Sequence, residues 1–204
     1  MEHFSPAEAM LRVTSADSSD KPFFSEISAT IRAEAGLENA AFAVTSDPKI
    51  AVAAIQEGEG AELSMPLGGE FDPSIASPFD MIGTVMKTSP EGRFIFEGSM
   101  MRGVEVVMGP SSVIRIGGVE TVVITNLLQA YDRMFFVHFD IMLEEKSVVA
   151  VKSAHHFRAA YGPMAREIIS VNAAGITSRT RGNFPIKRFA GPYRRWIVAS
   201  GPDR

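Results

Sequence analysis

Apolar residues in the first sixty positions recur either at helical spacing or in short buried runs. The pair Ser5-Pro6 is a typical helix start, and the helix formers after it predict an N-terminal helix over residues 1–13. Three more elements follow: a helix over residues 23–36, a buried strand over 39–48 and a helix over 48–58. This succession is a helix-strand-helix segment, as in an α/β layer.

Beyond residue 60, short β-rich runs are separated by Gly, Pro, Ser and Asn, which is typical of antiparallel hairpins or a meander. The pairs Gly68-Gly69 and Gly117-Gly118 suit tight turns, because such turns need a positive φ. A helix near residues 132–139 and strands over 146–151 and 167–172 complete the pattern. We therefore expect one α+β domain, in which a largely antiparallel β-rich region with one or two further helices follows the helix-strand-helix segment.

Composition narrows the chemistry of this chain of 204 residues. There is no cysteine, which excludes disulfides, thiolate metal ligands and cysteine nucleophiles and fits a reducing compartment. No window approaches about 18 uninterrupted apolar residues, and the N-terminus lacks the apolar core of a secretory signal. We expect a cytoplasmic protein that makes no membrane contact.

Charge is distributed unevenly along the chain. The net charge is −4, but the part up to residue 167 is strongly acidic and residues 168–204 are basic. The basic tail, residues 179–204, also carries aromatic side chains, a combination that can bind nucleic acid. Because the acidic body would repel a polyanion, we expect no nucleic-acid partner and expect the tail to dock on an acidic face or protein partner.

The stretch VVAVKSAHHFRAAYGP, residues 148–163, carries the candidate chemistry. Lys152, Ser153, His156 and Arg158 provide three potential cations and a hydroxyl at the end of a buried strand. Arg offers a planar fork to a carboxylate or phosphate, and Lys offers a point charge. They suit capture of an anion, but they would equally well satisfy backbone carbonyls or pair with acids such as Glu144 and Glu145.

A metal site and a serine nucleophile have weaker support. If the strand continued through residue 158, His155 and His156 would point to opposite faces, so one at most could face a given site. The sequence contains neither an HExxH motif nor a GxSxG motif. Asp17 and Asp20 could bind a cation or meet the Lys152 and Arg158 side chains, but their polar stretch is more typical of Asx turns and a helix cap.

The segment KSAHHFRAAYGPMAREIISVNAAGITS resembles the C-terminal domain of the MlrC-type, microcystinase-like metallopeptidase family. The family motif Lys-Ser-x-x-His-Phe-Arg-Ala matches residues 152–159, with His155 in a variable slot. Weaker landmarks follow the family order over residues 14–195: Asp17-x-x-Asp20-x-Pro22, Asp47-Pro48, Gly58-x-Gly60, Leu67-Gly68-Gly69, Gly103, Gly109-Pro110 and Gly175. The strand that the family has before Asp17 is expected to be short or missing here.

The resemblance implies that the zinc ligands of this hydrolase family lie in an N-terminal domain that this sequence lacks. We then expect no metal or other cofactor in this chain and no catalysis by it alone. Its role would be accessory: Lys152, Ser153, His156 and Arg158 would bind a substrate carboxylate, with Asp17 and Asp20 supporting them. The zinc domain would be on a separate chain, and a homo-oligomer is possible.

Two alternatives remain open. The first is a stand-alone protein for small-anion binding or assembly, without catalytic activity. The second is an independent hydrolase that uses His155 or His156 with Asp17 or Asp20.

Overall fold

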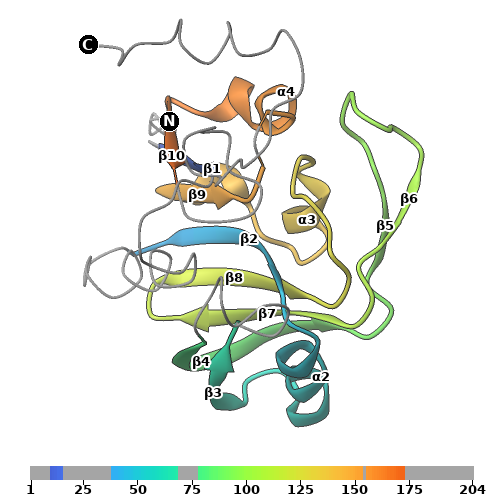
Figure 1. Cartoon of the computed structure of the whole chain (residues 1–204), viewed down its shortest axis with the longest axis vertical. Helices are drawn as coiled ribbons and strands as arrows, with labels where there is room; N and C mark the ends of the chain where they lie inside the picture. The colour runs from blue at the N-terminus through green and yellow to red at the C-terminus, as the bar shows by residue number, and fades with distance from the viewer. Residues whose placement is uncertain (1–9, 16–37, 69–77, 154, 173–204) are drawn as a thin grey trace, which may run out of the picture.

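The computed structural model describes residues 10–15, 38–68, 78–153 and 155–172 (Figure 1). The predicted helix over residues 23–36, the residues Asp17 and Asp20 and the basic tail lie outside the described residues. Within them, the predicted helix over residues 1–13 is wrong at its end, because Met10–Ser15 forms strand β1. This strand pairs along both edges, and such pairing overrides the weak helix propensity of a short segment.

The centre of the molecule is a sheet of eight strands in the order β10-β1-β9-β2-β8-β7-β4-β3 (Figure 1). The strands besides β1 are β2 (Ala40–Ser46), β3 (Glu62–Leu67), β4 (Phe79–Ser89), β7 (Ser111–Ile116), β8 (Val119–Ile124), β9 (Val148–Val151) and β10 (Glu167–Asn172). Neighbouring strands from β10 to β8 run parallel, and those from β8 to β3 run antiparallel.

The α+β class is confirmed, and the antiparallel pattern is confirmed for residues 62–124. The predicted strands over 39–48, 146–151 and 167–172 are also present. Their parallel pairing was not predicted. The buried runs of β2 and β9 are almost wholly apolar, as is usual for parallel strands covered on both faces.

Helix α2 (Pro48–Glu57) covers one face of the sheet (Figure 1). Its buried residues Ile50, Ala51 and Ala54 belong to a core with Ile114 and Val123 of the sheet. Strand β8 supplies both layers, because Val123 enters this core while its neighbours enter the core on the opposite face. Alternation along β8 therefore fixes which face α2 covers.

The opposite face is covered by short elements and a hairpin. The helical elements are α3 (Met134–Val137), α4 (Phe157–Tyr161) and the 3₁₀ turns η1 (Leu143–Glu145) and η2 (Gly162–Met164). Strands β5 (Arg93–Ile95) and β6 (Glu105–Val107) form a separate hairpin, and residues 93–107 are called the arm. Figure 1 shows the arm rising beside α3. No helix in the described part of the chain is long and apolar enough to cross a membrane.

Candidate functional site

The segment from Lys152 to Arg158 begins at the carboxyl end of β9. This strand lies between β1 and β2, and all three run parallel. Val151, the last residue of β9, is level with Val13 on one side and Ala43 on the other. The amide of Lys152 still donates to the carbonyl oxygen of Ala43, at 2.8 Å, before the chain leaves the sheet. In open α/β sheets, ligands bind beyond this edge.

The strand does not continue through the two histidines. The amide of Ser153 bonds back to the carbonyl oxygen of Val151, and α4 begins at Phe157 with His156 as its N-cap residue. Phe157 is fully buried, so its burial pulls the chain into a helix against the core. His155 and His156 are both exposed. The expectation that strand alternation separates their rings is therefore wrong.

The four candidate side chains differ in their surroundings. Ser153 is buried, and its hydroxyl makes no hydrogen bond within the described part of the chain. Lys152 reaches solvent, yet enough protein surrounds it for desolvation to lower the pKa of its amine. Arg158 is exposed, with its guanidinium carbon 5.2 Å from the centre of the Phe157 ring. Two exposed cationic residues and one buried hydroxyl therefore follow β9 within seven positions of the chain.

The sequence also allowed these cations to pair with Glu144 or Glu145, and the Glu144 carboxylate is bound elsewhere. The carboxylate of Glu144 pairs with Arg133, and the backbone carbonyl of Glu145 accepts a hydrogen bond from Asn39. His156 contacts the ring of Tyr131 edge-on, with 6.3 Å between ring centres. The Lys152–Arg158 segment therefore joins the end of β9 to the loop that precedes α3.

Asp17 and Asp20 lie outside the described residues, but the strand before them is defined. The expectation that this strand is short or missing is wrong, because β1 spans Met10–Ser15 and pairs with β9. Parallel pairing means that the chain leaves β1 at the same edge at which it leaves β9. Asp17 is two residues beyond Ser15 in the sequence.

The described residues contain no group of three or more His, Asp or Glu side chains placed to hold a metal ion. His138 instead lies with its Nε2 atom 2.9 Å from the hydroxyl of Ser89. Burial lowers the pKa of His138, against the opposing charge of Asp140. The expectation that this chain binds no zinc remains a prediction, because His3, Asp17 and Asp20 are not described.

Two buried carboxylates make bonds to distant segments that were not predicted from the sequence. Asp47 caps α2 and also accepts the amide of Gly68. Asp132 accepts the amides of Gly98 and Met134. The Asp47-Pro48 pair is itself a helix-start signal, but nothing local to Asp132 indicates its bond to the arm.

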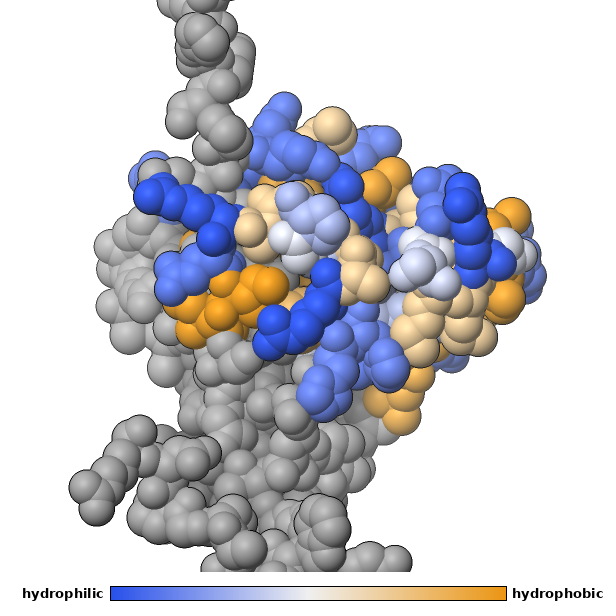
Figure 2. Space-filling model, turned by 90° about the horizontal axis from the view of Figure 1, so that it is seen from above, coloured by the Kyte–Doolittle hydropathy of each residue, from blue (hydrophilic) through white to orange (hydrophobic). Residues whose placement is uncertain are grey.

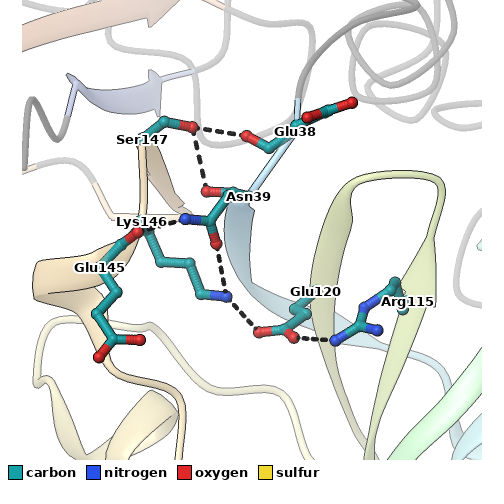
Figure 3. Close-up of polar contacts among 7 residues, drawn as sticks. All are labelled: Glu38, Asn39, Arg115, Glu120, Glu145, Lys146 and Ser147. Carbon is teal, nitrogen blue, oxygen red and sulfur yellow. Dashed lines mark hydrogen bonds and ion pairs between the residues drawn. The ribbon is translucent and has the colours of Figure 1, made fainter.

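A second polar cluster lies at the amino ends of the parallel strands (Figure 3). Glu120 binds both Lys146, at 2.8 Å, and Arg115, at 2.7 Å. The Lys146 amine also donates to Asn39, which precedes β2. Burial alone would raise the pKa of Glu120, but the hydrogen bonds and charges of Lys146 and Arg115 outweigh it and the pKa falls below its usual value. The cluster joins β7, β8 and the segment before β9, and we assign it to stability.

Replacing Glu120 with glutamine should lower the free energy of unfolding by about 2 kcal/mol at neutral pH, because it removes charge-assisted bonds from a largely buried position. In the parent, the folded-state pKa lies below the unfolded one, so this stabilisation is complete above the usual glutamate pKa and is lost as pH falls through the folded value. Urea denaturation between neutral and acidic pH should show a shallower acid loss for E120Q. Parallel curves for parent and variant would contradict the assignment.

Comparison with known proteins agrees with this architecture. The family model described as MlrC C-terminus matches residues 25–188. A crystal structure from Mesorhizobium sp. BNC1, whose protein carries the provisional name metallopeptidase, has a TM-score of 0.71 and 26% identity over 87% of this chain. The match covers 36% of that protein. No curated protein matches the sequence. The chain belongs to the MlrC C-terminus family.

Proposed function

We propose that this chain is the non-metal part of an MlrC-like hydrolase, in which Lys152, Ser153, His156 and Arg158 bind a substrate carboxylate. The observation that carries the proposal is the place of Lys152 and Ser153 at the carboxyl end of a central parallel strand. That edge is where sheets of this kind bind ligands. Family membership and the partial coverage of the solved relative support a role beside a further domain.

The chemistry of the side chains fits an anion. Arg158 would engage a carboxylate through its planar fork. A bound anion would offset the desolvation that lowers the pKa of Lys152. The buried hydroxyl of Ser153 would donate a hydrogen bond, and His156 would add a second donor at the rim. These interactions would orient a substrate without any bond-making step in this chain.

The proposal places zinc and the catalytic machinery in an N-terminal metallopeptidase domain, which a separate chain would supply. Asp17 and Asp20 would support the cations, since they follow β1 in the sequence and β1 ends at the edge that carries Lys152. The purified chain should therefore contain no tightly bound zinc and show no amidase activity. One equivalent of zinc by elemental analysis together with turnover would overturn this part and favour an independent hydrolase.

Acetate should bind the purified chain, and R158A should weaken its binding about 10-fold, since one charge-assisted hydrogen bond is worth about 1.5–3 kcal/mol. Chemical-shift titration by NMR would measure both dissociation constants. The control is K87A, which removes an exposed cation of β4, separated from β9 by three strands, and should leave acetate affinity unchanged.

Equal weakening by R158A and K87A would show general charge attraction and overturn the site. The alternative function, a stand-alone assembly protein, would show no acetate binding. It would also form a stable oligomer by light scattering coupled to gel filtration.

A further inference from the structure

A continuous set of ring contacts leads from His156 to the arm. The Tyr131 ring meets His156 edge-on, with 6.3 Å between ring centres. The Tyr131 ring also stacks on that of Phe96, on the inner side of the arm, with 5.0 Å between ring centres and 30° between ring planes. The hydroxyl of Tyr131 donates to the sulfur of Met101, in the turn of the arm, at 3.1 Å. Residues distant in sequence thus share one surface next to His156.

This surface combines a polar edge with an apolar one. Phe96 is buried beneath Tyr131, which is partly exposed, and Met101 is 52% exposed. Figure 2 looks onto the end of the molecule that carries α4 and the arm, and it shows hydrophilic and hydrophobic side chains mixed over this face. Burial and the charge of Asp132 raise the pKa of Tyr131, so its phenol stays neutral at physiological pH.

The apolar edge is held in place before any ligand arrives. One carboxylate oxygen of Asp132 accepts the amide of Gly98 in the arm at 2.8 Å, and the other accepts the amide of Met134 at the start of α3. Tyr161 of α4 donates to the backbone carbonyl of Asp132 at 2.7 Å. A Cβ at Gly98 would lie 2.8 Å from a carboxylate oxygen of Asp132, so the carboxylate would have to shift to accept it. Asp132 therefore connects the arm, α3 and α4, and such a fixed surface loses little entropy on binding.

We propose that Tyr131 and Met101 form an apolar subsite beside the carboxylate-binding side chains. The ligand class is a carboxylate that bears an aromatic or large aliphatic group a few bonds from the charged end. The aromatic ring and polarisable thioether favour such a group through stacking and sulfur–aromatic contact. This inference rests on the proposed function, and it adds the apolar half of the ligand.

The test compares acetate with 3-phenylpropionate by NMR titration of the purified chain. Both carry one carboxylate, and only the second carries a ring. The parent should bind 3-phenylpropionate about 10-fold more tightly than acetate, which corresponds to burial of a small apolar area. M101N and Y131A should each remove most of that difference, and M101N should leave acetate affinity unchanged.

Two variants are used because one of them, Y131A, could disturb folding. Y131A takes away a ring that packs on Phe96, whereas M101N changes an exposed residue whose φ of 57° asparagine tolerates well. V52Q is the matched control, because it removes an exposed apolar side chain from α2, on the other face of the sheet, and should change neither affinity.

The outcomes separate the two proposals. Acetate binding that depends on Arg158, with no preference for 3-phenylpropionate, overturns the apolar subsite and leaves the carboxylate site standing. A preference that M101N and Y131A leave intact also overturns the subsite. If acetate does not bind, or if R158A leaves its binding unchanged, both the carboxylate site and the subsite are overturned.

Discussion

Replacing Phe135 with alanine should lower the free energy of unfolding by about 4 kcal/mol, since loss of a fully buried ring costs about 3–5 kcal/mol. Phe135 is completely buried in α3. Its ring lies 5.0 Å from that of Phe94 and 6.3 Å from that of Phe96, both on the inner side of the arm. The variant therefore loses its own burial and also the contacts that hold the arm against the sheet.

Urea denaturation followed by far-ultraviolet circular dichroism would measure the loss. The matched control is V137A, which truncates a 45% exposed side chain two residues later in the same helix and should change stability by no more than about 0.5 kcal/mol. Limited proteolysis should also cut the arm of F135A faster than that of the parent. Similar stability of F135A and V137A would contradict the role of this ring as the anchor of the arm.

Local pattern predicted most elements because each has a local physical cause. The boundary between β2 and α2 is an example: an apolar run ends at a polar residue, and Asp47 and Pro48 then start a helix. The hairpin of β7 and β8 likewise follows from Gly117, which adopts a positive φ of 58°. Such signals act over a few residues and need no knowledge of distant partners.

The arrangement of the sheet could not be predicted in the same way. Strand β1 lies between β9 and β10, which come from the far end of the described chain. Nothing in Met10–Ser15 indicates these partners, and helix formers immediately before it favoured a helix instead. Long-range parallel pairing decided its conformation, and with it the edge of the sheet at which β1 ends.

In the candidate site, too, local sequence indicated the residues but not their arrangement. Its residues were proposed from the sequence and stay a prediction, but their conformation was not predicted, because the buried position of Phe157 turns the expected strand into α4. The contact between His156 and Tyr131 joins residues that no spacing relates. The double histidine, which first indicated a metal site, is an exposed turn before a short helix.

Asp47 provides the second large effect on stability. Its buried side chain accepts the amide of Ile50 in the first turn of α2 at 3.1 Å and the amide of Gly68 after β3 at 2.9 Å. The family landmarks Asp47-Pro48 and Leu67-Gly68 are therefore joined by a direct bond, although Asp47 and Gly68 are 21 positions apart. One carboxylate fixes both the start of the helix and the end of the following strand.

D47A should lower the free energy of unfolding by about 3 kcal/mol, because it leaves two backbone amides without their acceptor and removes a helix cap. D47N keeps one acceptor oxygen and should lose about half as much. The control S46A removes only an exposed bond to the backbone of Asn126 and should cost less than about 1 kcal/mol. If D47A and S46A were equally stable in urea, water would be replacing the carboxylate. The bond between the two landmarks would then be incidental to folding, since a buried acceptor that water can replace holds no two elements together.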